Sequence, residues 1–152
     1  MPKSKQRVLL AGGSAQETEA AFYEALQKGD LELLMACWAE EDEIVCVHPG
    51  GPRLLGHGAI RSVYEAIFAN GGIPVTPQRV QRSEGLANAV HSVLERVELG
   101  TDEGLQVGWI VATNVYQNTS HGWRLVAHHA SQGPENGGLA ELDIHAPATV
   151  LH

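Results

Sequence analysis

Positive charge, cysteine and long apolar runs are all scarce in this sequence of 152 residues. Ten lysines and arginines stand against 18 aspartates and glutamates, and the net charge of -8 argues against a general surface for nucleic acid or anionic membrane. No apolar run approaches the length of a membrane span. The basic start at residues 1–7 is followed by only four apolar residues, too few for a secretory signal. We therefore predict a cytoplasmic protein in which Cys37 and Cys46 are reduced, buried thiols.

Familiar catalytic and binding motifs are missing as well. The sequence has no P-loop, no nucleophile elbow, no Cys–His couple in a suitable context and no nucleic-acid motif. Residues 7–14 are like the first strand and glycine turn of a dinucleotide-binding domain, but the third glycine and the closing acidic residue are absent. We therefore expect no cofactor. The sequence leaves small-molecule chemistry in a pocket, or no chemistry at all.

The composition that is present, 43% hydrophobic and 18% charged, is typical of one globular domain with a proper core. Residues 15–39 predict two short helices, because Ser14 can cap the first, and Gly29 followed by Asp30 provides a stop and a new cap. A third helix is predicted to open at Gly56 and to end at the glycines of residues 70–72.

Five segments have the composition of β-strands: residues 43–48, 75–83, 86–99, 105–117 and 123–132. The last four are separated by short turn-like sequences, so successive strands should pair antiparallel. Helices followed by an antiparallel meander predict an α+β fold. A curved sheet wrapped around three helices would enclose a conical cavity and leave an apolar outer face, which a dimer commonly covers. We expect a domain at residues 15–133, a flexible arm at 1–14 and an extended tail at 134–152.

The order of several short pieces carries a family resemblance. The pieces are Trp38, Glu41-Asp42, His48-Pro49-Gly50-Gly51, Gly56 with Ile60, residues 112–116 (Ala-Thr-Asn-Val-Tyr) and residues 122–131. Together they resemble the SnoaL-like branch of the nuclear transport factor 2-like, or ketosteroid isomerase-like, superfamily. The resemblance implies a cone-shaped cystatin-like α+β barrel, usually a homodimer, with a pocket for a small molecule. Members include isomerases, dehydratases and polyketide cyclases, but also non-catalytic association domains, so the fold leaves the function open.

Strand alternation selects the first candidate site residues. Leu125, Ala127, His129 and Ser131 share the more apolar face of the last strand, so we predict that His129 and Ser131 face the cavity. His48 lies on the same face of its strand as Cys46 and is predicted to lie opposite His129. Either histidine could act as a general acid or base, and the alternative is a core histidine satisfied by hydrogen bonds. Adjacent histidines on a regular strand cannot both ligate one metal, so no metal site is predicted.

Glu95 is the candidate carboxylate. It shares a strand face with apolar residues, and burial there would raise its pKa toward neutrality. The alternative is a surface cross-strand partner for Arg96 or Arg124. The resemblance implies a cavity Asp or Glu as the base of an isomerase, with a tyrosine or a protonated acid as oxyanion donor. The Asp–Arg–Asp set of the epoxide hydrolases and the His–Asp couple of the dehydratases cannot be assembled from this sequence.

Other residues are candidates for ligand binding. Asn114 and Tyr116 share one face of a strand and could donate hydrogen bonds to a ligand carbonyl. Arg53 could bind a carboxylate at the pocket entrance, and Trp38 could contact a ligand or pack in the core. The hypothesis is acid–base chemistry, as in an isomerase, cyclase or dehydratase, on an apolar carbonyl-bearing ligand. The alternative is a non-catalytic dimerisation or protein-association domain.

Overall fold

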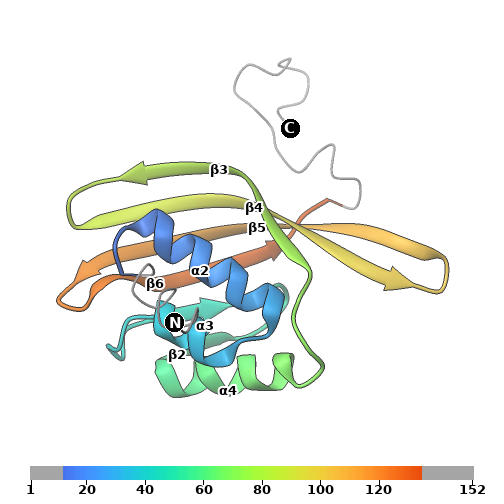
Figure 1. Cartoon of the computed structure of the whole chain (residues 1–152), viewed down its shortest axis with the longest axis horizontal. Helices are drawn as coiled ribbons and strands as arrows, with labels where there is room; N and C mark the ends of the chain where they lie inside the picture. The colour runs from blue at the N-terminus through green and yellow to red at the C-terminus, as the bar shows by residue number, and fades with distance from the viewer. Residues whose placement is uncertain (1–11, 135–152) are drawn as a thin grey trace, which may run out of the picture.

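The computed structural model describes residues 12–134 and shows three helices against one curved, unclosed sheet (Figure 1). Residues 1–11 and 135–152, which hold most of the predicted arm and tail, lie outside the described part of the chain. The helices are α2 (Ala15–Lys28), α3 (Leu31–Cys37) and α4 (His57–Phe68). The strands are β1 (Val45–Val47), β2 (Arg53–Leu55), β3 (Val75–Glu84), β4 (Asn88–Thr101), β5 (Gly104–Thr119) and β6 (Gly122–Gln132). The α+β prediction is confirmed.

The predicted helix boundaries at the start of the domain follow from local capping. The Ser14 side chain accepts a hydrogen bond from the Glu17 backbone N–H, 3.0 Å away, at the start of α2. Gly29 ends the helix with a left-handed φ of 67°, a conformation that glycine adopts without steric cost. Asp30 then caps α3 through the Leu33 N–H at 3.0 Å. These caps confirm the predicted two-helix corner.

The sheet has the order β2-β1-β6-β5-β4-β3. The meander from β3 to β6 is antiparallel, as predicted, whereas β1 pairs parallel with β6. This parallel pairing brings Cys46 next to His128 across two strands far apart in the sequence. The short strand β2 was not predicted, because three largely exposed residues carry no alternation signal.

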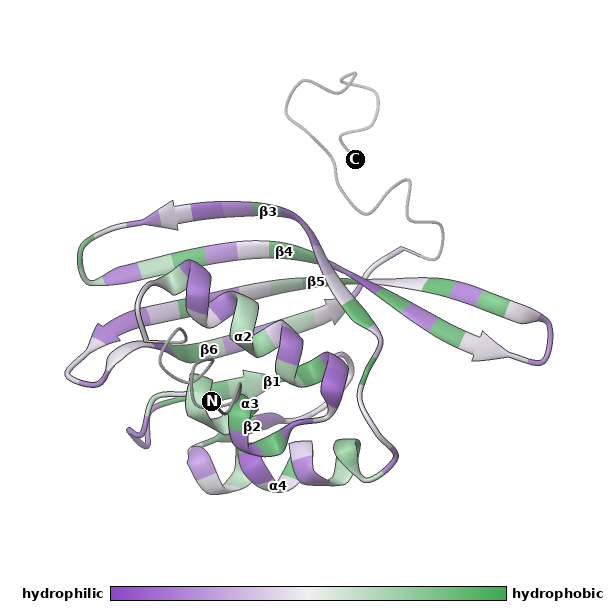
Figure 2. Cartoon of the chain, viewed as in Figure 1, coloured by the Kyte–Doolittle hydropathy of each residue, from purple (hydrophilic) through white to green (hydrophobic). Residues whose placement is uncertain are grey.

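The helices lie on one face of the sheet and form the core with it (Figure 1). The largest fully buried side chains include Phe22, Leu34, Trp38, Ile60 and Leu125. Figure 2 shows apolar and polar residues alternating along β4 and β5, and these two strands continue as a twisted ribbon beyond the other strands. No helix between residues 12 and 134 is long and apolar enough to cross a bilayer.

A β-bulge in β6 decides which side chains face the helices. Val115 pairs with Ala127, but the next residue of β5, Tyr116, pairs with Leu125, so Val126 is the extra residue. Leu125 points inward and is fully buried. Beyond the bulge the alternation is reversed, and His128 and Ala130 point inward instead of Ala127 and His129.

Candidate functional site

A cavity of about 130 Å³ lies between the inner face of the sheet and the helices. Its lining residues, most of them apolar, are Leu26, His48, Pro49, Tyr64, Ile73, Val75, Glu95, Val97, Ile110, His128 and Ala130. The titratable ones come from different elements: Glu95 from β4, His128 from β6, Tyr64 from α4, and His48 from the residue after β1. We call this space the cone cavity. It brings together two of the three predicted catalytic residues, His48 and Glu95.

Glu95 is a buried carboxyl with one protein partner. Its side chain lies among Val97, Ile110 and other apolar residues, and the residue is only 5% exposed. Tyr23 of α2 donates a hydrogen bond to Glu95 Oε2 at 2.6 Å. Burial raises the pKa of Glu95 to about 7, and the Tyr23 hydrogen bond offsets part of that rise. Glu95 therefore points into the cavity and is not a surface partner of Arg96 or Arg124.

A chain of three hydrogen bonds links Glu95 to His128. His128 Nδ1 lies 2.5 Å from Asn114 Oδ1, and Asn114 Nδ2 donates to the Tyr23 hydroxyl at 3.0 Å. The Tyr23 hydroxyl donates in turn to Glu95. His128 is 4% exposed and packs against the Phe22 ring, and burial lowers the pKa of His128 to about 3. The imidazole is therefore neutral at physiological pH.

His48 and Tyr64 form the other polar wall of the cone cavity. Their rings meet edge to face with centroids 5.0 Å apart, and the His48 and His128 rings are 6.2 Å apart. Cys46 Sγ lies 3.6 Å from His48 Nε2 and 3.9 Å from the Tyr64 hydroxyl. Burial lowers the pKa of His48. It raises the pKa of Cys46 to about 12 and the pKa of Tyr64 well above its ordinary value. Tyr64 therefore stays a phenol and can donate a hydrogen bond.

The predicted orientation of His129 and Ser131 is wrong. Both are exposed on the outer face of the sheet, where His129 pairs with Thr113 and Ser131 with Val111. The bulge at Val126 is the cause, because regular alternation from Leu125 would have turned His129 inward. His128 takes the inward position. Nothing in the local sequence of β6 marks the bulge.

The predicted ligand-binding residues are distributed over the molecule. Asn114 and Tyr116 are fully buried on the inner face but do not line the cone cavity, and Asn114 bonds to protein groups. Arg53 is exposed on β2, and Trp38 is buried behind a different groove. Sequence reasoning missed His128, Tyr23 and Tyr64. An aromatic residue at helical spacing is ordinarily a core residue, and no local signal separates Tyr23 or Tyr64 from one.

A second polar cluster lies farther along the inner face, around His91 of β4. His91 is fully buried, with Nδ1 2.9 Å from Glu19 Oε2 and Nε2 2.7 Å from Glu84 Oε2. Arg82 donates to the other oxygen of Glu19 at 2.8 Å. Each ring nitrogen of His91 contacts a carboxylate from a different element, so the cluster ties α2 to β3 and β4.

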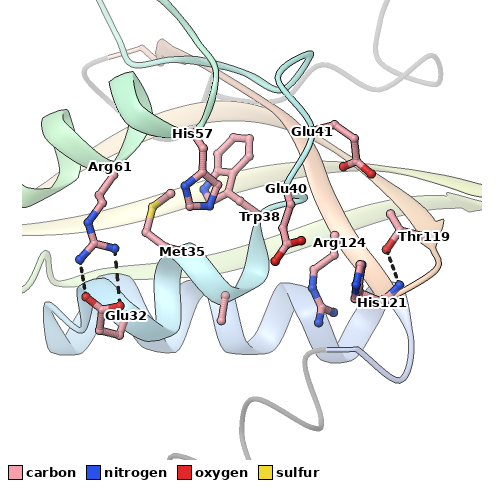
Figure 3. Close-up of a pocket in the computed structure, with 11 residues that line it drawn as sticks. Glu32, Met35, Trp38, Glu40, Glu41, His57, Arg61, Thr119, His121 and Arg124 are labelled. Carbon is pink, nitrogen blue, oxygen red and sulfur yellow. Dashed lines mark hydrogen bonds and ion pairs between the residues drawn. The ribbon is translucent and has the colours of Figure 1, made fainter.

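The larger groove, of about 350 Å³, lies outside the cone between α3, α4 and the β5–β6 turn (Figure 3). Arg61 of α4 pairs across it with Glu32 of α3, and Trp38 and Met35 contribute apolar surface. The Arg61–Glu32 pair is open to water, where such pairs contribute little. The groove gathers no buried titratable groups comparable to Glu95 and His128, so the cone cavity is the candidate site.

Metal ligands do not converge in the described part of the chain. Between residues 12 and 134, no three histidine, cysteine, aspartate or glutamate side chains are grouped as metal ligands would be. The cone cavity instead presents a carboxyl, two imidazoles and a phenol, a set suited to moving protons.

Comparison with known proteins assigns this chain to a family. The profile of the SnoaL-like domain matches residues 16–134, and the chain therefore belongs to the SnoaL-like family. Within the wider superfamily, a proposed dehydratase of the NTF2-like family from Streptomyces avermitilis is 34% identical. The match covers 79% of this chain and 94% of that one, with a TM-score of 0.70.

One further solved structure carries a different proposed role on the same fold, and another supports the fold alone. A proposed association domain of calcium/calmodulin-dependent protein kinase type II from Thiobacillus denitrificans is 31% identical over 81% of this chain and 98% of that one, with a TM-score of 0.73. An NTF2-like protein of unknown function from Pseudomonas putida is 18% identical, with a TM-score of 0.69 over 88% and 94% of the two chains, and supports the fold alone. No curated protein matches the chain.

Proposed function

We propose that this SnoaL-like protein carries out acid–base chemistry on a small, neutral carbonyl compound in the cone cavity. The observation that carries the proposal is Glu95, a buried carboxyl whose pKa is raised to about 7 and which lines the cavity. A general acid–base group works best when its pKa lies near the working pH, because it can then both accept and release a proton.

The reaction follows from the two walls of the cavity. Ionised Glu95 removes a proton from the carbon next to the carbonyl, and the electron pair of that C–H bond forms an enolate. The Tyr64 hydroxyl, held as a phenol, donates a hydrogen bond to the developing oxyanion. Protonated Glu95 then returns the proton to carbon. The protein groups alone balance this exchange, so no cofactor is required.

Cavity size and charge restrict the ligand. A cavity of about 150 Å³ holds benzene, so the 130 Å³ of the cone cavity suits a compound of about six non-hydrogen atoms. The lining contains no lysine or arginine to pair with an anion. Transfer of a carboxylate or phosphate into this space would leave its charge uncompensated, which is costly. The ligand we propose is therefore small and uncharged.

Hydrogen–deuterium exchange tests this proposal without knowledge of the natural substrate. Cyclopentanone and similar small ketones, incubated with the protein in D₂O, are expected to lose their α-proton NMR signals faster than in buffer. Glu95→Gln should lower the rate of catalysed exchange by a factor of about 10² or more, since general acid–base catalysis contributes about 10²–10⁴-fold. Denatured protein serves as the blank.

The two adjacent histidines provide a matched pair of variants. His128→Gln changes a residue that lines the cavity, whereas His129→Gln changes its neighbour on the outer face. We expect altered exchange only in His128→Gln. Equal exchange in wild type, Glu95→Gln and buffer for all ketones of this size would exclude the proposed chemistry.

A homodimer through the outer face of the sheet is the second proposal, and it fits a protein-association role. The outward positions of β4 and β5 include the apolar residues Val90, Leu94, Trp109, Val111 and Val115. An apolar sheet face of this kind is stabilised when a second surface covers it. Similarity to a proposed association domain also supports assembly of like subunits.

Light scattering after size-exclusion chromatography tests the dimer. Val111→Lys places a charge at the centre of the outer face and should shift a dimer to monomer, because an unpaired charge in an interface is costly. Ala66→Lys, on the exposed side of α4, adds the same charge elsewhere and should leave the mass unchanged. A wild-type monomer at all concentrations would contradict the dimer.

A further inference from the structure

Asn114 is fully buried, and both ends of its amide are occupied by protein groups. The oxygen can only accept, so His128 Nδ1, 2.5 Å away, must be the donor. The amide nitrogen can only donate, so the Tyr23 hydroxyl, 3.0 Å away, accepts there. Tyr23 must then use its own proton toward Glu95 Oε2, as the 2.6 Å contact shows.

All three hydrogen bonds therefore run in one direction, from His128 to Glu95. With its proton on Nδ1, neutral His128 carries a lone pair on Nε2, and the imidazole lines the cone cavity. No protein group of residues 12–134 bonds to Nε2 or to Glu95 Oε1. These two atoms are the free polar ends of the hydrogen-bonded series, and both of their residues line the cone cavity.

We infer that Asn114 is a positioning residue that fixes His128 as a hydrogen-bond acceptor, so that the cone cavity selects a small ligand carrying an O–H or N–H donor. The inference rests on the proposed function for the place where the ligand binds. It narrows the substrate class from neutral carbonyl compounds to those with a hydroxyl or amine N–H near the carbonyl. Asn114 itself touches no ligand.

The surroundings of His128 keep it an acceptor. From α2 it faces the Phe22 ring, and from the region of β1 it faces His48, a neutral imidazole at a centroid distance of 6.2 Å. Asn114 of β5 is its bonded partner, and His129 of β6 is its chain neighbour. Glu95 of β4 is reached only through Tyr23 and Asn114. No carboxylate touches the imidazole, and burial lowers its pKa.

The tautomer can be measured on the wild-type protein. Long-range ¹H–¹⁵N NMR of histidine-labelled protein at pH 7 is expected to show the His128 proton on Nδ1, with Nε2 unprotonated. A proton on Nε2 would overturn the inference, because the chain would then run from Glu95 to His128. This readout needs neither ligand nor turnover, so it can fail or succeed independently of the proposed acid–base function.

Pyrrole and furan test the ligand class, since both have five non-hydrogen atoms but only pyrrole has an N–H donor. Pyrrole is expected to bind about tenfold more tightly, as one buried hydrogen bond would provide. Equal or tighter binding of furan, or no binding of either compound, would overturn the selection of donor ligands. Both titrations can be followed by the chemical shifts of the cavity residues.

Variants at residue 114 separate positioning from simple structural support. Asn114→Asp keeps the acceptor for His128 and adds a charge, so the proton should stay on Nδ1 and the pKa of His128 should rise by about one to three pH units. Asn114→Leu removes the acceptor, and the preference for Nδ1 and for pyrrole should be lost. Asn118→Asp, exposed on the same strand, is the control and should change neither. An unaltered tautomer in a folded Asn114→Leu protein would remove Asn114 from this role.

Discussion

Glu19→Ala is expected to lower the free energy of unfolding by about 1–3 kcal/mol, the loss that follows when a buried hydrogen-bond donor is left without an acceptor. Glu19 is 4% exposed and holds both Arg82 and the fully buried His91. Without it, His91 Nδ1 would have no acceptor in the protein interior. Arg82 is partly exposed and can turn toward water, so the loss falls mainly on the imidazole.

Urea unfolding followed by tryptophan fluorescence measures this loss. Glu65→Ala on α4 removes a carboxylate from an exposed position and should change the unfolding free energy by no more than about 0.5 kcal/mol. Glu19→Gln retains one acceptor oxygen, so its loss of unfolding free energy should lie between those of Glu19→Ala and Glu65→Ala. A loss below about 1 kcal/mol in Glu19→Ala would show that the His91 cluster does not stabilise the fold.

Glu95→Gln is expected to be more stable than wild type at pH 8 by about 3 kcal/mol and equally stable near pH 4. Folding raises the pKa of Glu95 from its ordinary 4.5 to about 7, and each pH unit corresponds to about 1.4 kcal/mol. Between these two values the folded state keeps a proton that the unfolded state has released. The stability that protonated Glu95 contributes is therefore fully present below pH 4.5 and is lost as the pH rises toward 7.

His128 produces the opposite slope. Its pKa falls from the ordinary 6.5 to about 3 on folding, so the unfolded state binds the extra proton and stability rises with pH between these values. In wild type the two slopes oppose each other between pH 4.5 and 6.5. In Glu95→Gln only the rising slope of His128 remains. The two curves should therefore separate between about pH 4.5 and 7 and stay about 3 kcal/mol apart at higher pH.

Thermal and urea unfolding at a series of pH values distinguish these curves. Glu103→Gln, exposed in the β4–β5 turn, is the control and should follow the wild type. If Glu95→Gln were less stable than wild type at pH 8, the carboxylate would be gaining more from Tyr23 than it loses by burial. A gain in stability together with a loss of ketone exchange would indicate a strained functional group, which proteins commonly retain at active sites.

Most of the fold could be predicted because its signals are local. Ser14, Gly29 and Asp30 mark helix ends through side-chain or backbone preferences that act within a few residues. The meander strands are separated by short turns, and hairpin geometry then determines their antiparallel pairing. The parallel pairing of β1 with β6 joins segments about eighty residues apart, and no local preference encodes it.

The candidate site was predicted only in part, and the reason differs by residue. Glu95 follows from regular alternation in β4, which has no bulge in its pairing with β5. His129 was misplaced because one unpaired residue, Val126, reverses the alternation. Tyr23 and Tyr64 lie on helices, and the way these helices pack on the sheet is not encoded in their local sequence. Their contact with Glu95 and His48 is a property of the whole fold.

The bulge at Val126 also has an evolutionary consequence. Sliding it a few residues along β6, past the His-His pair, would exchange the histidine inside the cone cavity for the one outside without any substitution. Two relatives with the same pair of adjacent histidines can therefore differ in which histidine faces the cavity. An ungapped alignment of their sequences does not show this difference. Functional assignments within the family should accordingly be transferred by strand register and not by column identity.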